Sequence, residues 1–448
     1  MSKTLATAAC SLSWIFLLSC PVSAAPPKAT DGGADESPST RPVVRPDNLP
    51  DDLTVWPNRV SFRNSDPWIW QNHDHIRKMR PRVMVLNFAN DVDMPAIREH
   101  TEKLIKALAE ATRYHGFKDP GAPAFLEYEV VKYVDMRDDP IPPERKNRSS
   151  SLFPRKRRGP KDFNCDYRAF YGDAFARRYG FKDPGNPGRF LNLHELINSG
   201  LVHELWFHAV HIYEEGWPAF EVIELKQYYD EQCRPIPGKH GPAGNGYDDS
   251  FPWSGRSFRM AFFNPHRGIG CAMENFGHGL EAYRNSNAIA YFARYFEEFA
   301  DFNLNKRYKV PFDSLYQVSY DAPEKDWVTY PTPTSMKVRI RGKEYTLDPF
   351  IAAGGSVHWA PGARHHYDLD SPFTVKSTIE NWRMRNGPDG KDLVLDFNKD
   401  KFARYQDLAP DCQGAWMVFW RQCMPGLDNP CIDDDGKPMK NWWPFLFY

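Results

Sequence analysis

The residues with the clearest potential for chemistry lie in the segment Glu274-Asn-Phe-Gly-His278-Gly-Leu-Glu281. Positions i, i+4 and i+7 of an α-helix fall within about 60° of one another, so Glu274, His278 and Glu281 should share one helix face. Two carboxylates and an imidazole suit a divalent metal, with zinc as the first choice. A metal-free polar site and a purely structural polar face remain open as alternatives. The sequence therefore predicts a candidate metal site on a helix.

Two further segments carry candidate catalytic residues. Glu204 stands inside the apolar stretch 201–207, where a buried carboxylate needs a partner, a metal or a catalytic use. It is predicted to be a general base, with a structural ion pair to an arginine as the alternative. His358 is predicted to be the missing metal ligand or a general acid/base, and Arg364 to anchor an anionic group of a substrate.

The segment Glu274–Glu281 resembles a degenerate form of the zinc-metallopeptidase helix, whose motif is His-Glu-x-x-His. Glu274 stands in the place of the first His, Asn275 in that of the catalytic Glu, and His278 in that of the second His. The resemblance implies a zincin-like core that covers at most residues 201–284, and a metal-dependent hydrolase. Because the motif Glu is replaced by an amide, the usual base for water activation is missing there, and ordinary peptidase activity is not expected.

Three other pieces resemble a group of secreted microbial proteins of unassigned activity. They are Phe276-Gly-His-Gly279 with Glu281, Val357-His-Trp-Ala-Pro361 with Tyr367-Asp368, and the ending Asn441-Trp-Trp-Pro-Phe-Leu-Phe-Tyr448. This resemblance implies export and one integrated fold, and it implies no particular reaction.

The elements that must position these residues follow a strand–helix–strand pattern. Residues 82–88 form an almost continuous apolar run, which predicts a strand covered on both faces. A helix from Pro95 to about Tyr114 and a strand at 124–134 complete a βαβ unit. Further elements are expected as strands at 201–207, 220–225 and 258–263, helices at 271–284 and 289–302, and a Gly- and Pro-rich loop at 235–252.

The predicted fold class is therefore α/β, with mixed α+β as the alternative. A central, mostly parallel or mixed sheet is flanked by helices, and a loop-rich, disulfide-containing C-terminal region follows. Residues 52–320 form the predicted core domain with a basic loop at 135–161, interpreted as a solvated excursion rather than a polyanion site. Residues 321–448 form a C-terminal region packed on that core, and their apolar ending is expected to dock in it.

The N-terminus predicts export. An apolar run from Leu5 to Leu18 precedes the small residues Val22-Ser-Ala24, which is typical of a signal peptide spanning residues 1–24. Residues 25–51 are rich in Pro, Ser, Asp and Gly and predict a disordered leader. The protein is expected to be secreted or periplasmic, with lipoprotein anchoring at Cys20 as the alternative. No later stretch is apolar enough for a transmembrane segment.

Composition limits the classes of function. The 448 residues carry 57 basic and 58 acidic side chains, which argues against nucleic-acid binding by overall charge. Of eight cysteines, Cys10 and Cys20 leave with the signal, and the other six allow up to three disulfides. The sequence contains no P-loop, dinucleotide fingerprint or serine-hydrolase elbow.

The function predicted from these features is an exported, hydrolase-like protein with a divalent-metal site and a peptide or glycan as substrate. One alternative is a non-catalytic carbohydrate or cell-wall binding protein, since the chain has 14 Trp and 21 Tyr that could stack on sugar rings. The other is a metal-free glycosidase, which would need two carboxylates facing each other across a cleft.

Overall fold

The computed structural model describes residues 44–157, 163–210, 222–246, 251–319 and 327–448. The predicted signal peptide, most of the predicted leader and part of the basic loop lie outside the described residues. Within them the fold is a mixed α/β structure with sheets of mixed strand orientation, which confirms the predicted class at this level.

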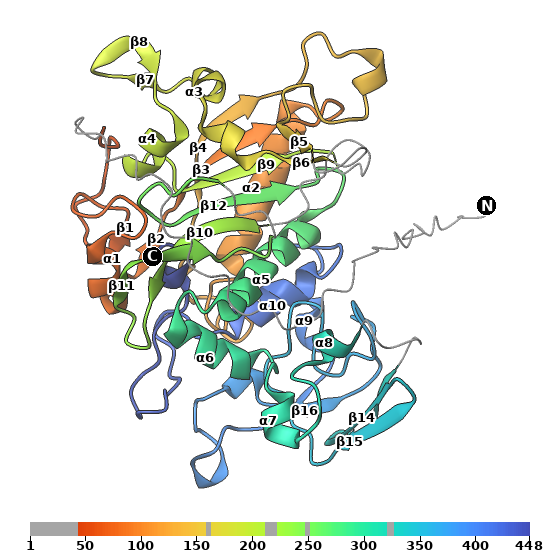
Figure 1. The fold of residues 1–448 in the computed structure, drawn as a ribbon. Coiled ribbons are helices and arrows are strands. Elements are labelled where there is room, and N and C mark those ends of the chain that lie inside the picture. The colour runs from red at the N-terminus through yellow and green to blue at the C-terminus, as the bar shows by residue number, and fades with distance from the viewer. Residues whose placement is uncertain (1–43, 158–162, 211–221, 247–250, 320–326) are drawn as a thin grey trace. The chain divides into compact units, whose positions relative to one another are not determined.

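A six-stranded sheet forms the centre of the fold, in the order β11-β10-β12-β9-β3-β4 (Figure 1). Four neighbouring strands run parallel, and two further strands extend one edge through antiparallel pairing, so that β10 runs opposite to its two neighbours β12 and β11. The parallel strands are β12 (Phe258–Phe263), β9 (Glu204–His208), β3 (Arg82–Asn87) and β4 (Glu129–Asp135), and the edge strands are β10 (Val222–Tyr229) and β11 (Pro235–Pro242).

Strand β11 corrects one prediction. Its Gly- and Pro-rich sequence was expected to form a loop, yet Gly241 and His240 pair with Lys226 and Gln227 of β10. Proline removes a backbone donor, which a central strand cannot spare, but β11 lies at the edge of the sheet, where one side of its backbone pairs with no strand of the described residues. The composition rule therefore failed because it does not distinguish edge from central strands.

Strand β3 is buried on both faces, as its apolar run predicts. Val83 and Val85 belong to one core and Met84 and Leu86 to the other. The first core is shared with helices α2 (Met94–Glu110), α5 (Ile269–Ser286), α6 (Ala290–Phe299) and α10 (Gly414–Gln422). The second is shared with η3 (Tyr167–Tyr171), α3 (Asp173–Tyr179) and α4 (Leu193–Asn198). Helical layers thus cover both faces of the sheet.

The remaining elements are short. Before the first long helix and on the second face lie β1 (Val55–Trp56), α1 (Pro67–Gln71), η1 (His73–His75), β2 (Lys78–Met79), η2 (Pro143–Arg145), β5 (Arg155–Arg157), β6 (Phe163–Cys165), β7 (Lys182–Asp183) and β8 (Asn186–Phe190). After α6 come α7 (Leu304–Tyr308), α8 (Leu315–Ser319), the three-stranded sheet β13 (Val328–Thr332), β14 (Ser335–Ile340) and β15 (Lys343–Leu347), then β16 (Val375–Ser377), η5 (Ile379–Asn381), η6 (Pro388–Gly390), β17 (Leu395–Phe397), α9 (Asp400–Ala403) and η7 (Trp443–Leu446).

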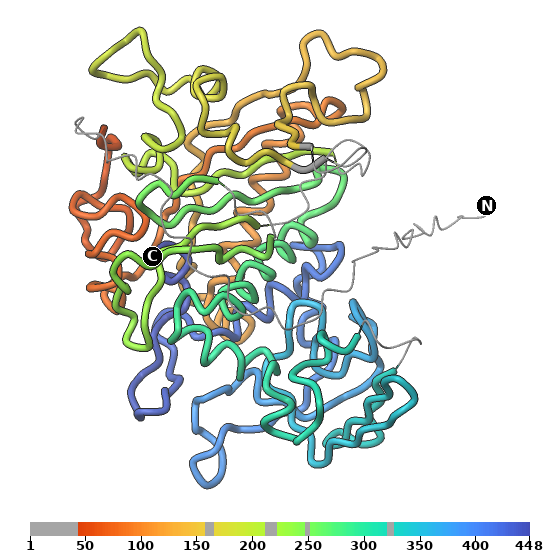
Figure 2. Tube along the Cα trace, viewed as in Figure 1, coloured from red at the N-terminus to blue at the C-terminus, as the bar shows by residue number. Residues whose placement is uncertain are grey.

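The C-terminal residues complete the first core, which confirms the docking predicted from their apolar sequence. Trp442, Phe445 and Tyr448 are fully buried. The chain end lies beside β10 (Figure 2), where the rings of Tyr448 and Tyr229 are 4.8 Å apart. In the described ranges, no helix combines the length and the apolar composition needed to cross a bilayer.

Two buried, neutral histidines connect distant segments of the chain through hydrogen bonds. His73 donates through Nε2 to the carbonyl of Asn441 (2.7 Å) and accepts at Nδ1 from the Tyr448 hydroxyl (2.5 Å). His203 joins Phe62 and Arg82 in the same way, with Nδ1 accepting from the Arg82 backbone N–H (2.9 Å). Since a backbone N–H can only donate, Nδ1 of His203 must keep its lone pair, and this ring cannot take a second proton without losing the bond from Arg82. Burial lowers the pKa of each histidine to about 3, and Lys440 adds to the effect at His73.

Acid should therefore destabilise the fold by protonating these rings. A histidine in the unfolded chain has a pKa of about 6.5, so below that pH the unfolded state binds more protons than the folded state. Stability falls as the pH drops from about 6.5 towards 3, by up to about 1.4 kcal/mol per pH unit for each ring. The free energy of unfolding, measured with urea, should fall between pH 7 and pH 5 by about 2 kcal/mol less in His203→Gln than in the wild type. Equal losses in the two proteins would contradict the assignment.

Candidate metal centre

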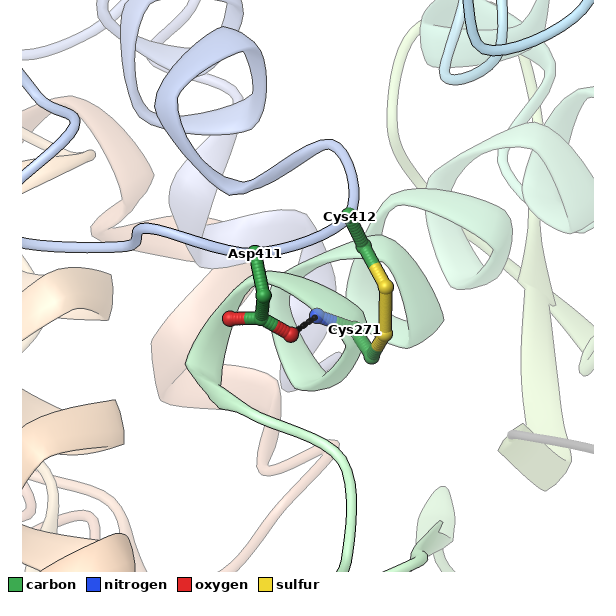
Figure 3. A group of neighbouring side chains, drawn as sticks. All are labelled: Cys271, Asp411 and Cys412. Atoms are coloured by element: carbon green, nitrogen blue, oxygen red, sulfur yellow. Dashed lines mark hydrogen bonds between the residues drawn. A yellow bond between two sulfur atoms is a disulfide. The ribbon is translucent and has the colours of Figure 1, made fainter. Parts of the chain in front are cut away.

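Helix α5 carries the centre of the site, and a distant segment holds its N-terminal end. The Asp411 carboxylate accepts from the backbone N–H groups of Gly270 (2.8 Å) and Cys271 (3.4 Å), so it caps the helix from 140 residues away. A disulfide joins Cys271 to Cys412 across the same contact (Figure 3). Gly270 permits the approach, because a Cβ there would lie 1.7 Å from the Asp411 carbonyl oxygen. The start of α5 is therefore fixed in position.

The disulfide Cys271–Cys412 links the C-terminal region to the core rather than stapling loops within that region. Cys233, Cys423 and Cys431 are buried thiols, and burial raises the pKa of Cys233 and of Cys431 to about 12. The sequence allowed up to three disulfides, and the part of the chain that the structure describes forms this one.

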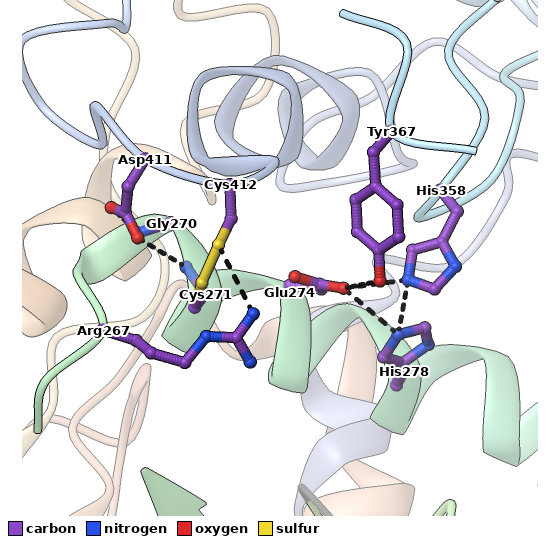
Figure 4. Close-up of a disulfide and its surroundings, with 9 residues drawn as sticks. All are labelled: Arg267, Gly270, Cys271, Glu274, His278, His358, Tyr367, Asp411 and Cys412. Carbon is purple, nitrogen blue, oxygen red and sulfur yellow. Dashed lines mark hydrogen bonds and ion pairs between the residues drawn. A yellow bond between two sulfur atoms is a disulfide. The ribbon is translucent and has the colours of Figure 1, made fainter. Parts of the chain in front are cut away.

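Glu274 and His278 of α5 meet His358 of a distant loop. Their side chains point toward one another (Figure 4), with the two Nε2 atoms of the histidines 3.0 Å apart. Glu274 Oε1 lies 2.8 Å from His358 Nε2 and 3.8 Å from His278 Nε2. All three ligand atoms fall within 4.8 Å of one another. Tetrahedral zinc with ligands at about 2.0–2.2 Å spaces them by about 3.4 Å, so shifts of about half an ångström would accommodate an ion. These residues could hold a metal ion.

The site is buried except on the side of Tyr367. The side chains of Glu274 and His358 are each 8 % exposed and that of His278 is 12 % exposed, whereas Tyr367 is 48 % exposed. The Tyr367 hydroxyl donates to Glu274 Oε1 (2.8 Å). Burial opposes ionisation of Glu274, but the neighbouring rings of His278 and His358 favour its charged form and hold the pKa of this carboxyl well below its usual range. Glu274 is therefore a carboxylate at neutral pH, the form that binds metals.

Glu281 stands behind His278 rather than beside the other ligand atoms. Its Oε2 lies 2.9 Å from His278 Nδ1, and its Oε1 accepts from the Val357 backbone N–H (3.1 Å). A carboxylate on the far nitrogen of a ligating histidine fixes the tautomer and turns the other nitrogen towards the metal. Of the two third ligands considered from sequence, the geometry favours His358 over Glu281. Glu281 orients His278 and ties α5 to the loop that carries His358.

The loop that carries His358 is held from its other side by helix α10. The indole N–H groups of Trp416 and Trp420 donate to the backbone carbonyls of Ser356 and Gly355, each at 3.0 Å. Gly355 has a φ of +66°, and a Cβ there would lie 2.3 Å from the Trp359 carbonyl oxygen. The tight turn of this loop therefore requires glycine at position 355.

Gly277 sets the distance between α5 and the same loop. A Cβ at Gly277 would lie 2.7 Å from a Val357 methyl group and 3.0 Å from Met417 Sδ, whereas a Cβ at Gly279 would meet Val222 at an ordinary 3.7 Å. Gly277→Ala should therefore destabilise the protein by about 1–3 kcal/mol through overpacking. Gly279→Ala should be neutral or stabilise by up to about 1 kcal/mol through helix propensity. Urea unfolding of both variants tests this, and equal effects would contradict it.

Glu204 does not join the Glu274–His278–His358 group. It is 1 % exposed and accepts from the Tyr128 hydroxyl (3.1 Å) and Trp206 Nε1 (2.9 Å), and it pairs with Arg259 (3.3 Å). Burial raises the pKa of Glu204, and Arg259 opposes that rise. The arrangement matches the alternative interpretation from sequence, a buried ion pair with an arginine.

The predicted anion anchor is also engaged within the fold. Arg364 makes a two-pronged contact with the Asp368 carboxylate, from Nε at 2.6 Å and Nη2 at 2.8 Å. This pair closes the turn that follows His358 and lies in the same segment as Tyr367.

In the basic loop, Arg145 and Arg155 donate to backbone carbonyls of residues 149–153. These contacts give both arginines a structural role.

Tyr367 and Asp411 are the contributors that sequence reasoning missed. Tyr367 entered only as part of a resemblance, and its spacing from His358 follows no helical or strand period. Asp411 stands next to Cys412, so the pairing of that cysteine with Cys271 would have been the signal for its capping role. Comparison of the chain with protein-family models, with curated proteins and with solved structures finds no match.

Proposed function

We propose that this protein is an exported, hydrolase-like protein that binds one divalent cation, with zinc as first choice, at Glu274, His278 and His358. The observation that carries the proposal is the convergence of two histidine Nε2 atoms and one carboxylate oxygen within 4.8 Å at a largely buried site. The N-terminal apolar segment and the Cys271–Cys412 disulfide support export.

Three protein ligands leave a further position for water or substrate, as in catalytic zinc sites. A zinc ion bound in this way supplies a Lewis acid and lowers the pKa of water. Glu281 holds the proton on His278 Nδ1, so that Nε2 is free to ligate. The Tyr367 hydroxyl lies on the exposed side and donates to Glu274 Oε1, so it orients this ligand from the side open to a substrate.

The zincin-like character of the helix is limited by Asn275. Its Nδ2 donates to the carbonyl of Phe262 at 2.7 Å, so this side chain anchors α5 to β12. A neutral amide engaged in this way cannot act as the base of a peptidase. We therefore expect esters and activated amides to be better substrates than peptides.

The carbohydrate-binding alternative loses its motivation. It rested on the number of tryptophans, but no tryptophan among the described residues is exposed. Most of them, such as Trp206, Trp416 and Trp442, are core residues. The tryptophan content of the described residues is therefore explained by packing.

The test is metal binding by the full chain. Protein stripped with a chelator should take up one zinc ion per chain in calorimetry, and zinc should raise its melting temperature. Hydrolysis of a panel of esters, amides and glycosides, with and without zinc, then identifies the reaction. A protein that stays metal-free when zinc is supplied would overturn the proposal.

A further inference from the structure

The disulfide at the start of α5 belongs to a second group of side chains with metal-ligand chemistry. The sulfur atoms of Cys271 and Cys412 and a carboxylate oxygen of Asp411 all lie within 4.8 Å of one another (Figure 3). This group shares no residue with the candidate metal centre, and its donors are two sulfurs and one oxygen. Such a donor set suits cations that bind thiolates well, such as zinc and cadmium.

The two sulfurs become ligands only when the disulfide is reduced. A dithiol reductant transfers its two hydrogens to Cys271 and Cys412, and its own two sulfurs join as a disulfide. Cys412 is exposed and Cys271 is buried, so the reductant attacks the Cys412 sulfur and Cys271 leaves as a thiolate. Cys271 lies in the first turn of α5, where the helix dipole stabilises that leaving thiolate.

The surroundings of the reduced sulfurs favour negative charge. The backbone N–H groups at the start of α5 point towards this end of the helix, and Nη2 of Arg267 lies 3.8 Å from the Cys412 sulfur (Figure 4). A divalent ion held by two thiolates and one carboxylate carries a single net negative charge. The helix start and the guanidinium therefore stabilise such a complex.

Asp411 is positioned to supply the oxygen. A Cβ at Gly268 would lie 2.4 Å from its Oδ1, so the carboxylate lies against a helix start that lacks side chains there. Each of its oxygens has two lone pairs, and the N–H groups of Gly270 and Cys271 use only one on each oxygen. Two sulfurs on tetrahedral zinc lie about 3.8 Å apart. The two cysteine Cα atoms are 5.4 Å apart, which allows that separation by side-chain rotation.

We propose that Cys271, Cys412 and Asp411 bind one zinc or cadmium ion once the disulfide is reduced. The ion displaces the proton of each thiol, and the fourth position of its tetrahedral shell is left to water. The disulfide and the metal complex are thus alternative states of the same two sulfurs, selected by the thiol–disulfide balance of the surroundings. The inference does not depend on the proposed function, because the two sites share no ligand.

The test is cadmium binding by the full chain before and after reduction. Protein reduced with dithiothreitol, and then freed of it in the absence of oxygen, should bind one more cadmium ion per chain than the oxidised protein. The additional ion should produce thiolate-to-cadmium absorption in the ultraviolet. The candidate metal centre cannot produce this absorption, because it contains no sulfur. His358→Ala should therefore keep it.

Three variants assign the absorption to these residues. Cys412→Ser removes one sulfur and should lose most of the cadmium affinity and of the absorption. Cys423→Ser changes a buried thiol outside the group and should keep both. Asp411→Asn retains an oxygen that can accept from the start of α5 but loses the charge, so cadmium should bind about tenfold more weakly or worse.

The outcomes separate this inference from the proposed function. It fails if the reduced chain takes up no additional cadmium, if Cys412→Ser keeps full uptake, or if circular dichroism shows the reduced chain to be unfolded in the presence of cadmium. Asp411→Asn keeps both cysteines and decides the matter if Cys412→Ser does not fold. Absence of zinc binding by the oxidised protein would remove the proposed function and leave this inference standing.

Discussion

His358→Ala should weaken zinc binding by more than about 100-fold. The substitution removes one of three ligand atoms and leaves Glu274 and His278 as an incomplete pair. Loss of an orienting residue behind a ligand typically costs 10–100-fold in metal affinity, so loss of the ligand itself should cost more. Glu281→Ala should fall in that lower range, about 10–100-fold, because it loosens the His278 ring without removing a ligand atom.

Calorimetric titration with a competing chelator measures both affinities. His75→Ala serves as the control, because this exposed histidine lies on η1 and is not part of the ligand group. Its zinc affinity should equal that of the wild type. Zinc should also raise the melting temperature of the wild type and of the control, but not that of His358→Ala at the same zinc concentration. Wild-type affinity in His358→Ala would remove this histidine from the site.

Arg259→Leu should destabilise the fold by about 3–5 kcal/mol, because it leaves buried carboxylates without their guanidinium partner. Arg259 pairs with Glu224 (3.0 Å) and Glu204 (3.3 Å) and also donates to the Tyr283 hydroxyl and the Leu446 carbonyl (3.1 Å). The network therefore joins three strands of the sheet (β9, β10 and β12), helix α5 and the C-terminal segment. Its loss should loosen all these parts together, which urea unfolding would report as a single large shift.

Arg294→Leu is the matched control for this prediction. Arg294 pairs with Asp434 and Glu231, but its side chain is 49 % exposed. Ion pairs at the surface contribute at most about 1 kcal/mol, so this variant should unfold close to the wild type. Similar losses in the two variants would show that burial does not set the strength of the Arg259 network. Such a result would reopen the assignment of Glu204 to a structural role.

Local patterns in the sequence predicted much of the framework. Strand β3 follows from an apolar run, α2 from its periodicity and from Pro95 in its first turn, and the shared face of Glu274 and His278 from helical spacing. These features depend on residues within a few positions of one another, where backbone geometry alone fixes direction. The strand assignment failed at β11, because edge position is a property of the whole sheet.

Local patterns could not predict which residues meet at the site. His358 lies 80 residues from His278, and the two meet because α10 holds one loop while Gly277 lets α5 approach it. The same packing turned Glu281 from a candidate ligand into the partner of His278 Nδ1.

The sequence by itself determined the central strands and helices, the carboxylates and imidazole on one face of α5, and the apolar ending that docks in the core. Only the tertiary structure decided which of those side chains meet His358, and that Glu204 faces Arg259 instead. The physical reason is that a helix or strand is specified by neighbours along the chain. A site is specified by distances between segments, which are set by how the buried side chains of the whole core pack together.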